Sequence, residues 1–280
     1  MWEQISFYNE PPLKIHNTVR LIELFSGIGA QAKAFERLGV PFESYRSCEI
    51  DKYAVMSYNA VHGTNFVPTD ITKLHAEDLG IVDRDKFTYL LTYSFPCQDL
   101  SLAGKRRGMG RDSGTRSGLL WEVERLLKEC GENLPQLLLM ENVEQVIAEK
   151  NKYDFDMWRE SLRNMGYTNK YQVLNAKDYG VPQNRSRCYM LSWLGEYDYD
   201  FPEPIVLKRR LKDVLEDNVD EKYYLTDKQV ESFVWRQEAQ RELGNAFADF
   251  TPLERSDTHT HTLRTVYRNG NDNYLRANDG

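Results

Sequence analysis

Residues 1–200 alternate between short apolar runs and segments whose apolar residues recur at helical spacing, and this alternation constrains the fold most strongly. The apolar runs predict strands at residues 18–25, 45–50, 86–95 and 134–143, and a short strand with a turn at residues 65–72. The helical spacing predicts helices at residues 31–39, 52–63, 118–130 and 154–167. Two further extended segments are predicted around a turn within residues 170–194. Because strands that alternate with helices build βαβ units, the pattern predicts an α/β fold with a mainly parallel sheet.

The composition changes near residue 200. Residues 201–226 combine prolines with dense charge, and residues 254–280 are polar and rich in turn-forming residues. A chain of 280 residues is long enough for one large domain with its own core and a smaller region beside it. We therefore expect a first domain over residues 1–200 and a smaller, less regular region over residues 201–280.

The charge balance restricts how the chain can bind nucleic acid. It carries 36 Lys and Arg against 43 Asp and Glu, a formal net charge of −7, so the surface as a whole does not favour phosphate. Local patches can still bind, and two basic segments occur, at residues 104–116 and 208–210. The second is interpreted as a solvated face. The first directly follows Cys97 and therefore bears on the chemistry discussed below.

Cysteine use and the absence of targeting signals indicate the cellular compartment. The four cysteines, Cys48, Cys97, Cys130 and Cys188, are far apart and form no C-x-x-C pair, which predicts no zinc or other metal site. Sparse cysteines are typical of a reducing, intracellular compartment. No signal peptide and no apolar run of about 18 residues is present, so we expect a cytoplasmic protein that does not contact a membrane.

A glycine-containing turn and two acids follow successive predicted strands. Residues 25–29 read FSGIG, Glu49 ends the second strand, and Asp70 follows in the next extended segment. Ligands of open parallel sheets bind where strands end, and a carboxylate there can accept the hydroxyl protons of a ribose. No Walker lysine follows the glycines, so a phosphate-free adenosyl cofactor, S-adenosylmethionine, is favoured over NAD. The alternatives are a plain strand–helix turn for the glycines and a turn or cap role for either acid.

A second group of polar residues lies at other strand ends. Pro96-Cys97-Gln98 ends one predicted strand and Glu141-Asn142-Val143 ends another, while Arg185 and Arg187 open the last extended segment. A cysteine is the side chain most nucleophilic near neutral pH, and its thiolate is favoured by nearby positive charge. These strand ends therefore mark a second candidate site, at which Cys97 could act as a nucleophile.

The ordered set of motifs resembles the C5-cytosine DNA methyltransferases. FSGIG, the acid of SCEID, the aspartate of TDIT, PCQ, GLLWE, ENV and QNRSR follow one another in the family's order across residues 18–195. Each motif is weak alone, but the ordered set is specific. The resemblance implies a Rossmann-like S-adenosylmethionine-dependent methyltransferase fold, with residues 201–280 as part of a target-recognition region.

The resemblance also implies a reaction and its residues. A methyl group would pass from S-adenosylmethionine to C5 of a cytosine flipped out of double-stranded DNA, after the Cys97 thiolate adds to C6 of the ring. Glu141 would supply a proton at N3. Arg187 would order Glu141 and bind O2 of the base, and Arg185 would assist at the carboxylate or a phosphate.

The family's cofactor contacts carry over to matching positions. They are Phe25 against the adenine, Gly27 and Gly29 by close backbone approach, Glu49 at the ribose, Ile50 packed on the adenine, Asp70 at the adenine amine, and Leu119 lining the pocket. Residues 104–116 would close over the flipped nucleotide, with Ser101, Lys105, Arg106 and Arg107 as candidate DNA contacts.

The sequence departs from the family near its end. A final helix with a Gly-Asn pair, which completes the cofactor pocket in the family, is not recognisable here; Gly244-Asn245 lacks matching surroundings. Three hypotheses follow: a DNA methyltransferase that needs a second polypeptide for turnover, a truncated relative that binds cofactor or DNA without turnover, and an RNA cytosine methyltransferase. The length of the region after residue 200 favours DNA. The target sequence, and a role in restriction–modification rather than in a phage or alone, stay open.

Overall fold

The structure is a computed structural model that describes residues 12–100, 108–111, 114–242, 253 and 257–260. The chain divides into two compact units. The first comprises residues 1–173 and 187–201, and the second comprises residues 174–186 and 202–280. The break after residue 201 lies next to the composition change, but residues 174–186 group with the later part of the chain. The role of residues 201–280 in target recognition stays a prediction.

Six strands form one sheet in the order β2-β1-β3-β4-β6-β5. They are β1 (Thr18–Leu24), β2 (Phe42–Cys48), β3 (Phe87–Tyr93), β4 (Leu137–Val143), β5 (Tyr167–Asn175) and β6 (Ser186–Leu194). The pairs β1–β2, β1–β3 and β3–β4 are parallel, and β6 runs antiparallel to β4. The sheet is therefore mostly parallel, which confirms the predicted α/β class and brings the carboxyl ends of β1 to β4 to one edge.

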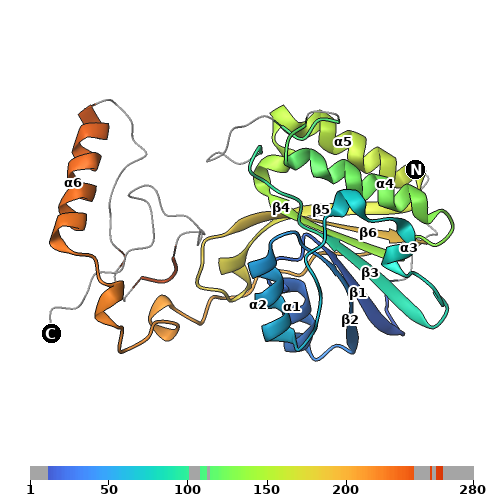
Figure 1. Cartoon of the computed structure of the whole chain (residues 1–280), viewed down its shortest axis with the longest axis horizontal. Helices are drawn as coiled ribbons and strands as arrows, with labels where there is room; N and C mark the ends of the chain where they lie inside the picture. Colours follow the sequence, from blue (N-terminus) through green and yellow to red (C-terminus); the bar gives the residue numbers. More distant parts are fainter. Residues whose placement is uncertain (1–11, 101–107, 112–113, 243–252, 254–256, 261–280) are drawn as a thin grey trace, which may run out of the picture. The chain divides into compact units, whose positions relative to one another are not determined.

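Helices cover both faces of this sheet (Figure 1). They are α1 (Ala30–Leu38), α2 (Lys52–His62), α3 (Ala76–Leu79), α4 (Leu120–Cys130) and α5 (Glu149–Asn164). Side chains alternate along β1, so Leu21 packs in a cluster with Ala32 of α1 and Tyr58 of α2. Its neighbour Ile22 packs in the larger cluster that holds Trp158 of α5. Two cores, one on each face, thus hold the strand ends in place.

One predicted strand is absent from the described residues. Residues 65–70 form no strand, and the 3-10 segment η1 (Ile71–Lys73) follows them. Asp70 caps η1 by accepting from the backbone N of Thr72 at 3.0 Å, and Asn59 fixes the incoming chain through the backbone of Phe66. The expectation of a strand over 65–72 was wrong because Asx-type capping satisfied the backbone locally.

The described part of the second unit contains few regular elements. They are the 3-10 segments η4 (Ala176–Tyr179), η5 (Leu211–Asp213) and η6 (Glu221–Tyr223), and the helix α6 (Asp227–Glu242). The sequence of α6 is polar and charged and has no apolar stripe at helical spacing, so the sequence did not predict this helix. The expectation of a smaller, less regular region over residues 201–280 stays a prediction.

Candidate active site

Cys97 lies on the turn that follows β3, and hydrogen bonds to two neighbouring carbonyls hold that turn in place. The side-chain amide of Asn142, in β4, donates to the carbonyl of Phe95 at 2.9 Å, with both groups buried. The hydroxyl of Ser117 donates to the carbonyl of Pro96 at 2.6 Å. Because buried carbonyls need partners, these bonds favour one path for the chain that leads into Cys97.

The residues after Cys97 are held by residues 116–117. The buried carboxylate of Asp99 accepts from the backbone N of Arg116 at 3.0 Å and from that of Ser117 at 3.4 Å. The Arg116 guanidinium donates to Oε1 of Gln98 at 2.7 Å. The turn carrying the thiol is thus anchored on both sides, and Cys97 itself remains half-buried rather than enclosed. The sequence did not single out Asp99 or Ser117, since their role depends on a contact across 18 residues.

The other three cysteines are enclosed in the core, as expected for inert thiols. Burial raises the pKa of Cys48 to about 12, that of Cys130 to about 11 and that of Cys188 to about 12. They therefore stay protonated near neutral pH. Of the four thiols, Cys97 alone is outside this buried class.

Glu141 and Arg187 meet on neighbouring strands. Val143 of β4 lies opposite Arg187 of β6, and Glu141 lies opposite Tyr189, so both charged side chains project from the same face at diagonal positions. Nε of Arg187 is 3.0 Å from Oε1 of Glu141, and the two side chains are 15% and 20% exposed. A carboxyl held by a guanidinium at a strand end is oriented while still reachable from solvent.

Arg185 belongs to the second unit and is positioned by a different set of contacts. Its backbone N donates to Oδ1 of Asn175 at 3.0 Å, and its carbonyl accepts from the backbone N of Ala176 at the same distance. The two arginines predicted from one motif therefore lie in different units, and Arg187 pairs with Glu141.

The FSGIG turn begins directly after β1 and contains two left-handed positions before its last glycine. Phe25 has φ 58° and Gly27 has φ 55°, a conformation that costs a residue with a side chain about 1 kcal/mol. Oε2 of Glu49 accepts from the backbone N of Gly27 at 3.0 Å, and its Oε1 accepts from that of Asp51 at 2.9 Å. Glu49 thus fixes the turn from the end of β2.

The remaining predicted cofactor residues have different surroundings. A Cβ on Gly29 would clash with His62 and lie 2.7 Å from a ring carbon of Tyr58, so this glycine allows α2 to approach the turn. Ile50 is 69% exposed, Phe25 and Leu119 are half-buried beside the core, and the carboxylate of Asp70 is engaged at Thr72. Bonds from Thr72 lower the pKa of Asp70 below its usual value.

These groups fit an adenosyl cofactor by their chemistry. The ends of β1 and β2 present the aromatic Phe25, the exposed apolar Ile50 and the carboxylate Glu49, while a Cβ on Gly27 would meet nothing within 4 Å. An apolar wall, a carboxylate for hydroxyl groups and open space at a glycine are what a ribose and adenine require. Within the described ranges, the Glu49 carboxylate is bound by two backbone N–H groups and by no side-chain cation.

Buried carboxyls beside these turns escaped the sequence analysis. Glu23 of β1 is 1% exposed, accepts from the hydroxyl of Tyr58, and burial raises its pKa. Glu124 of α4 is bound by Arg111, whose guanidinium also lies over the ring of Trp121 at 4.2 Å. Their partners come from distant segments, so no local pattern marks them. The candidate DNA contacts Ser101, Lys105, Arg106 and Arg107, and the Gly244-Asn245 pair, lie outside the described residues.

Comparison with known proteins decides the family. A family model described as C-5 cytosine-specific DNA methylase matches residues 19–279. The chain belongs to this family. Type II methyltransferase M2.ScrFI of Lactococcus lactis subsp. cremoris is 33% identical over 260 residues, covering 76% of this chain and 71% of that protein. M.NlaX of Neisseria lactamica is 34% identical over 249 residues, covering 89% and 75%.

Solved structures agree on the fold. The crystal structure of S. pombe Dnmt2 methyltransferase matches with a TM-score of 0.66 at 24% identity and covers 94% of this chain and 77% of that one. The predicted methyltransferase fold and the family resemblance are confirmed, and the chain is classed as a DNA cytosine-5 methyltransferase. Within the described ranges, no cluster of three or more His, Cys, Asp and Glu is suited to a metal, and no helix is long and apolar enough to cross a membrane.

Proposed function

We propose that this chain transfers a methyl group from S-adenosylmethionine to C5 of a cytosine extruded from double-stranded DNA, through a covalent bond from Cys97 to C6. One observation carries the proposal. Asn142 of β4 binds the turn that presents Cys97, while its neighbour Glu141 is held by Arg187. The proposed nucleophile and the proposed proton donor thus lie at the ends of adjacent parallel strands, β3 and β4, which supports the proposal.

Cys97 and Glu141 account for the bond at C6 and the proton at N3. The Cys97 thiolate adds to C6, and the electron pair displaced from the C5–C6 bond requires a proton or hydrogen bond at N3, which Glu141 supplies. Arg187 fixes the carboxyl direction and offers its guanidinium to the O2 side of the ring. S-adenosylmethionine supplies an electrophilic methyl on a sulfonium. Loss of the C5 proton to a base, and return of the N3 proton to Glu141, then expel the Cys97 thiolate and restore the ring.

The target base must leave the duplex because the Cys97 thiol could not otherwise contact it. A thiol on a strand-end turn cannot contact C6 inside a stacked duplex, and unstacking one nucleotide costs a few kcal/mol. The half-buried position of Cys97 and the partial exposure of Glu141 suit a base that enters from solvent. Contacts to the cofactor would come from Phe25, Gly27, Glu49 and Ile50. Asp70 and Leu119 complete the proposed set, and Gly29 supports it by allowing α2 to approach.

The test is methyl incorporation with tritiated cofactor into double-stranded DNA. Cys97→Ser is expected to abolish incorporation while cofactor affinity by calorimetry stays within twofold. Cys130→Ala, a change at a buried thiol on the far end of α4, serves as the matched control and should retain turnover. Near-normal turnover by Cys97→Ser would remove this residue from its proposed role.

The alternatives are separated by the same assay. Incorporation into transfer RNA in preference to DNA would favour an RNA substrate. Cofactor binding without incorporation by the chain alone, with turnover restored by an added polypeptide, would favour a split enzyme. The description of the family model that matches residues 19–279, C-5 cytosine-specific DNA methylase, favours DNA.

A further inference from the structure

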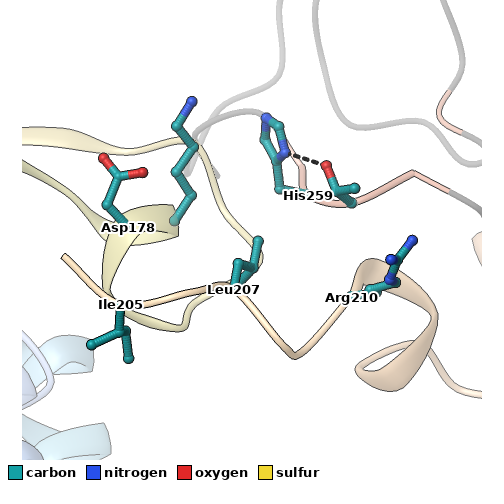
Figure 2. A pocket seen from close by; sticks show the side chains of 7 residues that line it. Asp178, Ile205, Leu207, Arg210 and His259 are labelled. Carbon is teal, nitrogen blue, oxygen red and sulfur yellow. Dashed lines mark hydrogen bonds between the residues drawn. The ribbon is translucent and has the colours of Figure 1, made fainter.

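A cavity of about 320 Å³ lies within the second unit. Figure 2 shows its lining, which comes from three stretches of the chain. They are η4, the segment following residue 202, and residues 258–259. The lining residues are Lys177, Asp178, Ile205, Leu207, Arg210, Thr258 and His259.

Backbone hydrogen bonds join the three stretches. The N of Ile205 donates to the carbonyl of Asp178 at 2.8 Å. Thr260 forms a bridge with Gln183, and its N donates to the carbonyl of Pro182 at 3.0 Å. The cavity wall is therefore held by main-chain contacts rather than by the side chains that face it. Such a preformed wall lowers the entropic cost of binding a ligand.

The charged groups of the lining favour an anion. Lys177 and Arg210 contribute two fixed positive charges and Asp178 one negative charge. In the described part of the chain neither cation has an ion-pair partner within 4 Å, although Asp178 neighbours Lys177 in sequence. Nδ1 of His259 lies 2.7 Å from the hydroxyl oxygen of Thr258. In the tautomer in which this hydroxyl donates to Nδ1, Nε2 carries the ring proton and can donate to an anion. Ile205 and Leu207 add apolar surface beside these donors (Figure 2).

The balance of charge and apolar surface selects among anions. One net positive charge with an apolar wall suits a phosphodiester, which carries a single negative charge between two sugars. A free phosphate dianion gains less from Ile205 and Leu207 and meets the carboxylate of Asp178. The basic segment 208–210, which the sequence suggested to be only a solvated face, supplies Arg210 to this cavity.

We propose that this cavity binds a backbone phosphodiester of DNA through Lys177, Arg210 and His259. The inference rests on the proposed function, which makes DNA the substrate. Contacts of this kind fix the register of a protein on the duplex and carry no sequence information of their own. The site therefore positions DNA, while base reading is left to other residues.

The experiment measures binding of a mixed-sequence duplex by fluorescence anisotropy over a series of salt concentrations. Lys177→Gln and Arg210→Gln should each weaken binding. Each should also make the negative slope of log K against log salt shallower by about 0.9. Across a fourfold rise in salt, each variant should thus lose about threefold less affinity than the parent chain. Lys228→Gln, an exposed lysine of α6 outside the cavity, is the matched control and should keep the parent slope.

Outcomes separate this site from the proposed reaction. Parent-like slopes for both variants, with unchanged melting temperatures, would overturn the phosphodiester site even if the parent methylates DNA. Reduced slopes in a chain that shows no methyl transfer would retain the site and count against the reaction. Competition by millimolar inorganic phosphate that equals competition by a short duplex would identify a free-phosphate site instead and overturn the proposal.

Discussion

Replacing Glu124 by Gln tests how firmly the segment after Cys97 is docked on α4. The Glu124 side chain is 4% exposed and receives bonds from Arg111 at 2.8 Å and from the ammonium of Lys128 at 3.2 Å. Burial opposes ionisation of this carboxyl, but the bonds from Arg111, Ser161 and Lys128 outweigh burial and set its pKa at about 2. The ring N–H of Trp121 adds a bond to the carbonyl of Met109 at 2.8 Å.

The magnitude follows from that pKa. The difference between about 2 and the usual 4.5 corresponds to about 3 kcal/mol of stabilisation of the charged form in the folded state. Because the folded pKa is depressed, this stabilisation is present above pH 4.5 and is lost as the pH falls toward 2. Glu124→Gln should therefore lower the free energy of unfolding by about 3 kcal/mol at pH 7, or about 6–12 °C in Tm.

The assay is thermal unfolding at several pH values, with Glu122→Gln as the control on the same helix. Glu122 pairs with Arg125 at 2.8 Å, but these side chains are 28% and 31% exposed, so its loss should cost less than about 1 kcal/mol. The difference in Tm between the parent and Glu124→Gln should become smaller as the pH is lowered. A variant that melts within 1 °C of the parent at pH 7, or a gap that is constant with pH, would refute this account.

Three further results are expected. Gly29→Ala should lower the free energy of unfolding by about 2 kcal/mol or more beyond Gly27→Ala, measured by denaturant titration, because both have positive φ but only the first new Cβ meets side chains of α2. A thiol reagent at neutral pH should label Cys97 in the native protein and the buried cysteines only on unfolding, as counted by mass spectrometry, because burial raises the pKa of those thiols to about 11 or 12. Arg187→Gln should lower kcat about tenfold or more, because it releases Glu141, while cofactor affinity stays within twofold. Arg187→Lys should recover part of kcat. Equal losses of kcat in both variants would argue against an orienting role.

The candidate residues at the strand ends could be predicted from the sequence because each belongs to a short motif of consecutive residues. A cysteine after an apolar run, an acid after another, and a glycine turn after the first strand are each local patterns. Their order along the chain identified the family, and the strand and helix periods gave the α/β class.

Only the tertiary structure decided how those residues are held. The register of β4 against β6 brings Arg187 to Glu141 and leaves Arg185 to a second unit, although the two arginines are two residues apart. Asp99 anchors the Cys97 turn through backbone groups of residues 116–117. Residues 65–70 were expected to be extended in the sheet and are held by side-chain caps instead. Each of these outcomes depends on partners distant in sequence or on competition between local and sheet hydrogen bonds, which the periodicity of side chains does not encode.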